Sequence, residues 1–404
     1  MVITLSALEY EVKLLKELVS IKSITGNSEE YKRIANLISK ELTALGLRLT
    51  IHDGEKEAKD GISRPNIVAY YDAGAPRTIG FLTHYDVVST SSKWREKAFS
   101  LRIYEENGEK RASGRGSADD KGCIAALMGA IRDIITRKLE LDWNIAFICT
   151  ADEEIGGEYG AGYIARNKLV ELDALVVLDS SSMGLVVGTS GIVHGNIVIK
   201  GKPGHAGYLF GSDNALHKAI VFLNELLGFV NSRAMSLSKL RNPPSIPIPN
   251  VWGRFSLTWI KSDNMTYNVI PGKITVGFDM RLLPEEDPEF VLSQLKSYFE
   301  MTKYRLCLHD IKLEIIRAFP GYMTDENHPF VKKAMDALYK ATGKKLPVIG
   351  MLGGNDGGWF RDYGIPIISF GVWDEKSNIH GDNESVSLKK IEELKSFIIN
   401  LVRK

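Results

Sequence analysis

Cysteine is scarce in this sequence. The 404 residues include three cysteines, Cys123, Cys149 and Cys307, and none of them forms a C-x-x-C pair. An odd number without such spacing argues against a disulfide framework. Two of the three lie in apolar segments, which favours buried thiols in a reducing compartment.

Long apolar runs and an excess of one charge are also missing. No stretch approaches the roughly 20 apolar residues of a membrane-spanning helix, and the N-terminal residues do not resemble a secretory signal. Basic residues number 51 and acidic residues 50, a net charge of +1. This balance predicts neither nucleic acid nor an anionic membrane as a partner. We therefore expect a cytoplasmic protein.

The remaining composition is that of an ordinary globular protein, with 44% hydrophobic and 25% charged residues. Its length exceeds a usual domain of about 100–200 residues, so two domains are expected. Val- and Ile-rich runs alternate with helical stretches, among them a helix over 121–137. Such alternation predicts an α/β fold, with a mostly parallel sheet and helices on both faces. The predicted strands are 66–72, 78–86, 144–150 and 174–181.

The pattern changes near residue 190. Strand-like and helix-like segments then follow in the order βαββαβ, with helices expected over 213–230 and from "PEFVLSQLKSYFEMTK". This order predicts a ferredoxin-like α+β domain over 190–317, inserted between 1–189 and 318–404. The proline-rich stretch 242–250 is expected to be a rigid connection within the insert.

Acidic residues and histidines recur at the carboxyl ends of the predicted strands, where ligands bind in open parallel sheets. Two imidazoles and three carboxylates without cysteine suit zinc, cobalt or manganese. Five ligands exceed one tetrahedral zinc, whereas two metals bridged by one carboxylate use five naturally. The seven candidate residues from which such a set of five ligands would be drawn are His84, Asp86, Asp119, Glu153, Glu154, Asp179 and His380.

Two adjacent glutamates, Glu153 and Glu154, follow the apolar run "NIAFICT". Adjacent strand residues point to opposite sides, so two useful acids at this place are expected to do different jobs. The alternative is a solvated acidic loop. The nearby "GRGSADDKG" lacks the G-x-x-x-x-G-K-[ST] spacing of a phosphate loop, which argues against nucleotide binding.

Seven motifs in order resemble a known family across nearly the whole chain: "THYDVV", "GRGSADDKG", "TADEEIGG", "GKPGHAG", "NVIPGKITVGFDMR", "GGNDGGWFR" and "IHGDNE". They are similar to the di-zinc family of acetylornithine deacetylase, succinyl-diaminopimelate desuccinylase, aminoacylase and glutamate carboxypeptidase. The resemblance implies a zinc-exopeptidase-like catalytic domain in 1–189 and 318–404. It also implies that 190–317 is a lid and dimerisation domain.

The resemblance further implies a role for each candidate residue. Asp119 would bridge two divalent ions, with His84 and Asp179 on one, and Glu154 and His380 on the other. Asp86 would orient the imidazole of His84, and the peptide between Asp119 and Asp120 would be cis. Glu153 would be the general base that takes a proton from water and passes it to the leaving amine.

In the inserted domain the resemblance implies that His205 is an oxyanion donor, supplied by domain closure or by a partner subunit. It places Asn268 and Arg281 at substrate-contact positions, although Arg281 could equally be a structural ion-pair residue. It also implies substrate contacts from Gly353, Gly354 and Asn355. A homodimer through the inserted domain is expected, because a two-fold dimer is the commonest way to use such a self-complementary surface.

Two departures from the deacetylase pattern bear on the substrate. Many relatives have an arginine that grips the substrate carboxylate where this chain has Gly358, followed by Trp359. Ligand position 179 is aspartate, which is commoner in the dipeptidase and aminopeptidase branches. Both favour a peptidase (dipeptidase, aminopeptidase or carboxypeptidase) acting on short peptides. The alternatives are an N-acyl amino acid deacylase, in which Arg361 or Arg281 supplies the charge, and a non-catalytic binding protein that keeps the fold.

Overall fold

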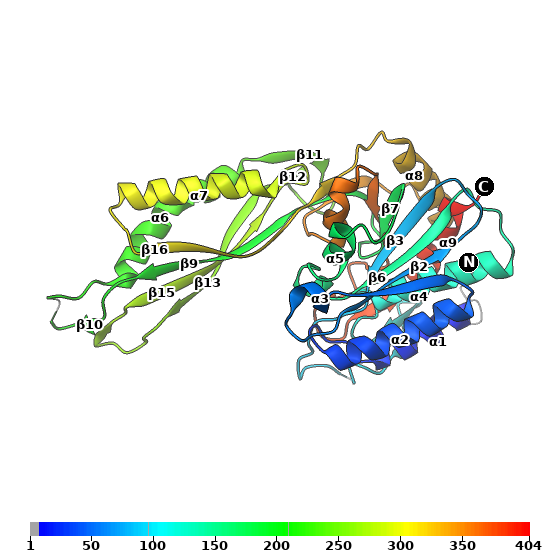
Figure 1. The fold of residues 1–404 in the computed structure, drawn as a ribbon, viewed down its shortest axis with the longest axis horizontal. Helices are drawn as coiled ribbons and strands as arrows, with labels where there is room; N and C mark the ends of the chain where they lie inside the picture. The colour runs from blue at the N-terminus through cyan, green and yellow to red at the C-terminus, as the bar shows by residue number, and fades with distance from the viewer. Residues whose placement is uncertain (1–7, 96, 209) are drawn as a thin grey trace. The chain divides into compact units, whose positions relative to one another are not determined.

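The computed structural model describes residues 8–95, 97–208 and 210–404. The chain divides into two compact units. The first comprises Met1–Gly188, Met323–Ile349 and Asn355–Lys404, and the second comprises Thr189–Tyr322 and Gly350–Gly354. Each unit has its own sheet and its own hydrophobic core, so each is described by itself (Figure 1).

A nine-stranded sheet organises the first unit, with eight strands in the order β1-β2-β6-β3-β7-β19-β8-β17 and β18 paired to β8. The pairs β6–β3, β3–β7 and β7–β19 are parallel, whereas β1–β2, β2–β6 and β19–β8 are antiparallel. The mostly parallel α/β sheet predicted from the sequence is confirmed for its centre, and its flanks are antiparallel. The strands are β1 (Arg48–Asp53), β2 (Pro65–Tyr71), β3 (Thr78–His84), β6 (Asn144–Thr150), β7 (Ala174–Val177), β8 (Leu185–Thr189), β17 (Tyr322–Met323), β18 (Val348–Met351) and β19 (Ile367–Ser369).

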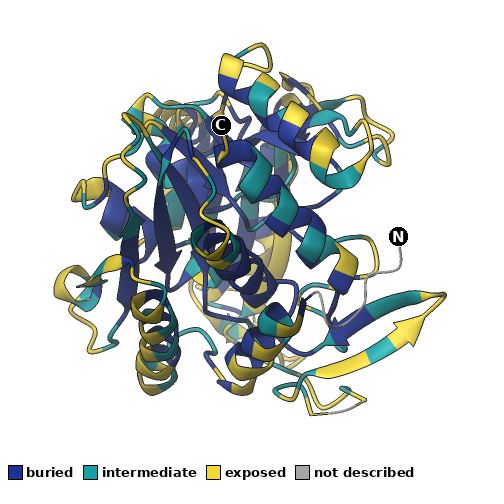
Figure 2. Ribbon diagram, turned by 90° about the vertical axis from the view of Figure 1, so that its right-hand side faces the viewer, coloured by how far each residue is buried: buried dark blue, intermediate teal, exposed yellow. Residues whose placement is uncertain are grey.

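Helices cover this sheet, and their amphipathic patterns explain why. The helix α4 lies where the sequence predicts one, and it is buried on nearly all sides, as expected for a helix apolar all round. In contrast, α1 and α2 bury one face and expose the other, while α9 is mostly buried, and Figure 2 shows the central strands buried beneath these helices. The start of α2 is capped, because Asn27 Oδ1 accepts the N–H of Glu30 at 3.3 Å. The helices are α1 (Glu9–Ser20), α2 (Ser28–Ala44), α3 (Glu55–Ala58), α4 (Lys121–Thr136), α5 (Ala161–Arg166), α8 (Pro329–Thr342) and α9 (Leu388–Val402), with the 3₁₀ helices η2 (Glu153–Ile155) and η3 (Asp356–Tyr363).

A small antiparallel sheet, β20-β5-β4, joins distant parts of the first unit. Its strands are β4 (Arg102–Glu106), β5 (Glu109–Ser113) and β20 (Ser385–Ser387). Because β5 precedes the loop of Asp119 and β20 follows the loop of His380, their pairing brings the two loops to the same place. This sheet therefore positions two of the predicted site residues.

The second unit has the βαββαβ order predicted for a ferredoxin-like domain. Its four-stranded antiparallel sheet has the order β13-β15-β9-β16, which puts the first strand beside the last and the third. The helices α6 and α7 contact each other and pack on this sheet (Figure 1). The elements are β9 (Ile192–Lys200), β10 (Gly204–His205), α6 (Ala215–Ala234), β11 (Leu237–Arg241), β12 (Asn250–Trp252), β13 (Arg254–Ser262), β14 (Val269–Ile270), β15 (Lys273–Arg281), α7 (Pro288–Arg305) and β16 (Ile311–Phe319).

The core between this sheet and its helices is aromatic at its centre. Phe222 of α6 and Phe299 of α7 meet edge to face with ring centroids 4.9 Å apart, a favourable geometry for two aromatic rings. The rings of Phe255 and Phe278 stack at the same distance on neighbouring strands. The proline-rich stretch 242–250, expected to be a rigid connection, joins the paired strands β11 and β12 as a hairpin loop.

Candidate metal centre

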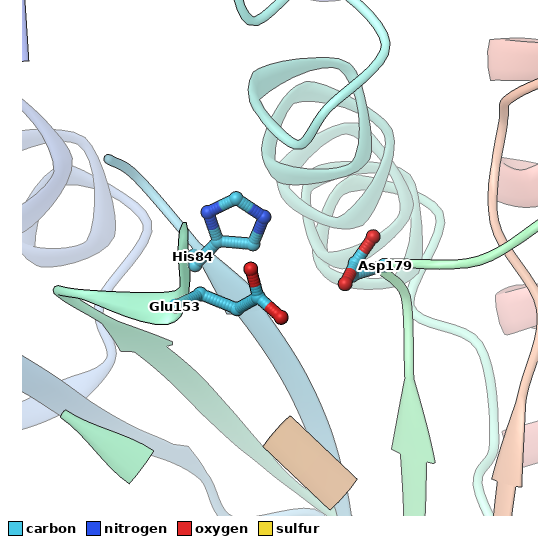
Figure 3. A group of neighbouring side chains, drawn as sticks. All are labelled: His84, Glu153 and Asp179. Carbon is cyan, nitrogen blue, oxygen red and sulfur yellow. The ribbon is translucent and has the colours of Figure 1, made fainter. Parts of the chain in front are cut away.

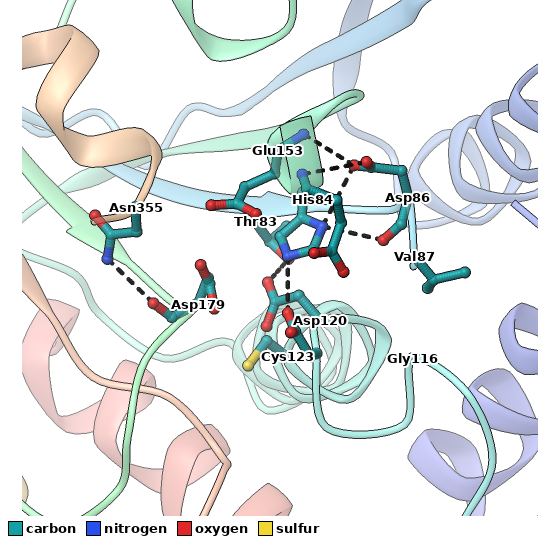
Figure 4. Close-up of polar contacts among 12 residues, drawn as sticks. Thr83, His84, Asp86, Val87, Gly116, Asp120, Cys123, Glu153, Asp179 and Asn355 are labelled. Carbon is teal, nitrogen blue, oxygen red and sulfur yellow. Dashed lines mark hydrogen bonds and ion pairs between the residues drawn. The ribbon is translucent and has the colours of Figure 1, made fainter. Parts of the chain in front are cut away.

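His84 ends the central strand β3 and is almost completely buried. Its Nδ1 lies 3.1 Å from the carbonyl oxygen of Asp86 and 3.4 Å from the Oδ1 of the same residue (Figure 4). Because a carbonyl oxygen can only accept a hydrogen bond, the proton of the neutral imidazole lies on Nδ1. The Nε2 lone pair is then available, and it faces Asp119.

Asp119 lies between two histidines that are far apart in the sequence. Its Oδ1 is 3.1 Å from Nε2 of His84, and its Oδ2 is 3.1 Å from Nε2 of His380. The peptide between Asp119 and Asp120 is cis, as the resemblance implies. Each oxygen of this carboxylate therefore lies close to a different histidine.

The two adjacent glutamates lie on a 3₁₀ turn, not on a strand. The strand β6 ends at Thr150, and Asp152 then adopts a left-handed backbone with φ of 63°. Tyr31 and Arg64 both donate to the Asp152 carboxylate and hold this residue in place. Strand alternation was therefore the wrong reason to expect Glu153 and Glu154 to point apart, because successive residues of a 3₁₀ helix already point about 120° apart.

Two groups of metal-binding side chains result, and within each group one ligand atom per residue lies within 4.8 Å of the others. The first contains His84, Glu153 and Asp179 (Figure 3), and the second contains Asp119, Glu154 and His380. The second group matches the set implied by the resemblance. The first has Glu153 beside His84 and Asp179, while Asp119 also reaches His84 from the other group.

Burial and crowding perturb the titration of these side chains. Burial and the charge of Asp179 raise the pKa of Glu153 well above its usual value, and burial and the charge of Asp119 do the same for Asp179. Burial and the charge of Asp119 raise the pKa of Glu154 to about 7. Hydrogen bonds that His380 donates to Asp119 and Glu154 raise the pKa of His380 to about 10.

Burial and repulsion between neighbouring carboxylates thus disfavour the charged forms of Glu153, Glu154 and Asp179 when only protein groups surround them. Divalent cations would favour the charged forms, because buried charges are stable in proteins when they are paired or bind metal ions. The donors are imidazole nitrogens and carboxylate oxygens, which suit zinc, cobalt or manganese. The residues therefore fit two cations, in agreement with the expected pair.

Several residues that the sequence analysis did not single out hold this cluster. Glu384 is fully buried, and its carboxylate accepts the N–H groups of Ala118 and Asp119 at 2.8 and 3.1 Å. Thr83 donates to the side chain of Asp120, which precedes α4 and makes no side-chain cap there. Membership of Glu384 in the motif "IHGDNE" was the one sequence signal for it.

The segment after β18 supports the cluster from another side. The side chain of Asn355 donates to the backbone oxygen of Asp179 and to Ser369 Oγ, both at 3.1 Å, and accepts the N–H of Gly357. These contacts position the chain at Asp179, and substrate contact by Asn355 stays a prediction. The indole N–H of Trp359 donates to Gly156 at 3.0 Å, which ties η3 to the turn of the two glutamates.

The remaining predicted residues belong to the second unit, and their roles stay predictions. His205 is exposed on β10, which pairs with β14 beside Asn268. Arg281 forms a two-pronged ion pair with Asp279 at 2.7 and 2.9 Å, the structural role that the sequence left open. Gly353 and Gly354 lie in the short segment after β18, where a Cβ on Gly354 would come within 2.9 Å of the Ser190 oxygen.

Known proteins are similar to this chain in sequence and in structure. A model of "Peptidase family M20/M25/M40" matches residues 80–404. In sequence, an uncharacterized metallohydrolase of Methanococcus maripaludis is 25% identical over 429 residues, covering 98% of this chain and 100% of that protein. A succinyl-diaminopimelate desuccinylase of Beijerinckia indica is 26% identical over 411 residues, covering 98% of each chain. In structure, a di-peptidase of Saccharomyces cerevisiae has a TM-score of 0.79 at 16% identity, covering 98% of this chain and 95% of that one.

The family match spans most of the chain and confirms the resemblance predicted from the seven motifs. The structural similarity, at low identity, supports the fold alone. Within the described ranges, no helix has the length and apolar character needed to cross a membrane. The chain belongs to peptidase family M20/M25/M40, whose members are metal-dependent hydrolases of amide bonds.

Proposed function

We propose that the cluster binds two divalent cations and that the protein hydrolyses a peptide bond next to an amino acid. His84 and Asp179 would hold one cation, Glu154 and His380 would hold the other, and Asp119 would be a ligand of both. The observation that carries this proposal is the placement of Asp119, whose two oxygens each lie 3.1 Å from a different histidine. When bound, such cations would polarise the scissile carbonyl and lower the pKa of an attacking water.

We assign proton transfer to the carboxylate of Glu153. Its backbone N–H is fixed by Asp86, which keeps the side chain beside His84 and Asp179. A carboxylate whose pKa lies above its usual value is better suited to accept a proton from water and return it to the leaving amine. Glu153 is thus the general base of the proposed reaction, although it lies within reach of a cation.

His205 is proposed as the donor to the oxyanion. Its Nδ1 accepts the N–H of Gly207 at 3.1 Å, so the proton of the neutral ring lies on Nε2. That N–H points away from this local bond and is available as a donor. Asn268 lies on the neighbouring segment of the same chain. Its carbonyl oxygen accepts the N–H of Ala206 at 2.9 Å. We assign these two neighbouring residues to substrate binding, and we assign Arg281, Gly353 and Gly354 to it as well.

The proposed substrates are short peptides. Gly358 stands where the deacetylase pattern has an arginine that binds a substrate carboxylate. The charge-assisted hydrogen bonds of such a guanidinium contribute roughly 1.5–3 kcal/mol. The di-peptidase similarity in fold and aspartate at position 179 are compatible with this choice. The alternative is an N-acyl amino acid deacylase, favoured by the similarity to a desuccinylase. A non-catalytic role is disfavoured, because the proposed base and all five proposed ligands are present.

A homodimer through the second unit is also proposed. The strand β13 is at an edge of its sheet and carries Trp259 and Ile260, whose side chains are exposed. The neighbouring helix α6 adds exposed apolar side chains at Ile220 and Val221. Unpaired strand edges and contiguous apolar surface favour association, and a two-fold pair is the commonest outcome.

We propose zinc as the native metal, with cobalt or manganese as alternatives, and a reducing, cytoplasmic location. The location is supported by Cys123 and Cys149, which are buried and unpaired, and by Cys307, which is exposed and unpaired. Exposed free thiols are stable in compartments where disulfides are rare.

A hydrolysis assay with a panel of short peptides and N-acyl amino acids, with and without added zinc, tests the proposed function. Metal-dependent cleavage of at least one peptide supports it. Full activity after complete removal of metal contradicts the two-cation mechanism, and cleavage of N-acyl amino acids in preference to every peptide supports the alternative.

A further inference from the structure

A buried ion pair, Arg115 with Glu384, lies behind the proposed metal centre. Both side chains are almost completely excluded from solvent, with exposures of 2% and 0%. Arg115 Nη1 donates to Glu384 Oε2 at 2.8 Å. Removing two charges from water costs more free energy than a surface ion pair contributes. The other hydrogen bonds of a buried pair are therefore needed to stabilise it.

Glu384 uses the rest of its carboxylate on the loop that ends at Asp119. Its Oε2 also accepts the N–H of Gly116 at 2.9 Å, and its Oε1 accepts the N–H groups of Ala118 and Asp119 at 2.8 and 3.1 Å. One side chain thus fixes three backbone groups within four residues, the last of them the backbone of the proposed shared ligand.

Arg115 holds the other loop. Its Nη2 donates to the carbonyl oxygens of His380 and Gly381 at 3.3 and 3.1 Å, and to that of Ser89 at 3.3 Å. Its guanidinium carbon also lies 5.3 Å from the ring of Trp94. The backbone of His380 is left-handed, with φ of 61°, a conformation that a non-glycine residue keeps when its surroundings hold it.

We propose that Arg115 and Glu384 form a clamp that positions Asp119 and His380 for the second cation, the one also held by Glu154. Asp119 and His380 both lie on irregular loops, whereas His84 ends the buried strand β3 and Asp179 closely follows β7. The sheet therefore holds two of the first cation's three proposed ligands without the clamp, whereas the clamp holds two of the three proposed for the second cation, Asp119 and His380. This proposal rests on the two-cation centre proposed above, and Arg115 and Glu384 act in it as positioning residues.

The test is the number of bound metal ions and their affinity in Glu384→Gln. Glutamine keeps the shape but removes the charge and replaces one acceptor oxygen with a donor that faces an N–H group or Arg115. We expect the dissociation constant of the weaker cobalt or zinc site to rise about 10–100-fold, as is typical for residues that orient metal ligands. Elemental analysis after dialysis should then find one ion per chain, against two in the wild type.

The matched control is Asp374→Asn. Asp374 forms a two-pronged pair with Arg111, with both distances 3.0 Å, in the same unit and without contact to either proposed ligand. It should lose stability and keep both ions. If Glu384→Gln does not fold, Arg115→Lys replaces it, because lysine keeps the charge but cannot reach Glu384 and the two carbonyl groups together.

The outcomes separate the clamp from the centre that it serves. Selective loss of one ion in the clamp variant, with both kept in Asp374→Asn, supports the clamp. A folded clamp variant that binds both ions as tightly as the wild type overturns it. A wild-type protein that binds fewer than two ions overturns the two-cation centre and the clamp together.

Discussion

The backbone N–H of Glu153 donates to Oδ1 of Asp86 at 3.1 Å. The same oxygen is 3.4 Å from Nδ1 of His84, and the other carboxylate oxygen accepts the N–H of Glu154 at 3.3 Å. One buried carboxylate therefore fixes the orientation of a proposed ligand histidine and the turn that carries the proposed base. A change at Asp86 should disturb both the metal centre and proton transfer.

Replacing Asp86 with asparagine tests this link. An amide nitrogen at either oxygen position would face an N–H donor, so the turn or the imidazole should shift. We expect metal affinity to fall about 10–100-fold, measured by titration with zinc or cobalt. The control Thr25→Val removes a hydroxyl that donates to Asp86 at 2.9 Å while leaving the carboxylate, and should have a smaller effect. Unchanged affinity in Asp86→Asn would show that Asp86 does not orient the ligands.

Glu153→Gln should separate the base from the ligands. If Glu153 transfers protons, the variant keeps both ions and kcat falls about 10²–10⁴-fold, the usual contribution of a positioned base. Metal content and turnover are measured on the same preparation. Loss of an ion would instead show that Glu153 binds the cation together with His84 and Asp179. Normal turnover with both ions present would show that Glu153 is neither the base nor a ligand.

Metal removal should abolish activity, and added zinc, cobalt or manganese should restore it, because the proposed cations polarise the substrate and activate water. Elemental analysis should find less metal in His84→Ala and Asp119→Ala, with the larger loss in Asp119→Ala because that carboxylate serves both cations. The control is His309→Ala, which changes an exposed histidine in the second unit. Wild-type metal content in both ligand variants would refute the assignment.

His205→Ala should lower kcat more than it raises KM, since an oxyanion donor acts mainly in the transition state. A loss of about 10²–10³-fold in kcat is expected for one such donor. His217→Ala, an exposed position on α6, is the control. Sedimentation of the active protein tests whether His205 acts in its own subunit or in a partner subunit. A fully active monomer would show that His205 is not supplied by a second subunit.

Short peptides or apolar N-acyl amino acids should be cleaved with a higher kcat/KM than N-acetylornithine or succinyl-diaminopimelate. The reason is the missing guanidinium at Gly358, which weakens recognition of a free carboxylate at that place. Gly358→Arg should shift the ratio towards carboxylate-bearing substrates, although Gly358 is buried, so folding must be checked alongside. A kcat/KM for either named substrate that exceeds every peptide tested would overturn the choice and leave the metal chemistry intact.

Much of the fold could be predicted because it depends on local sequence. The apolar run over 121–137 predicted α4, and the Val- and Ile-rich runs predicted the strands β2, β3, β6 and β7. The candidate ligands were found the same way, since the carboxyl end of a strand is a local feature. Which strands pair, and in which direction, is not determined by local sequence. The direction of β2 against β6, and the 3₁₀ turn that replaced the expected strand geometry at Glu153, depend on contacts with distant residues.

The sequence by itself determined which metal-binding side chains exist and which elements carry them, because residue type and local periodicity are both written along the chain. Only the tertiary structure decided which of them meet. Asp119 lies between His84 and His380 because the loop of Asp119 is bonded to Glu384, 265 residues away. Such contacts form when burial leaves polar groups that must find partners, and local sequence does not specify which partners those are.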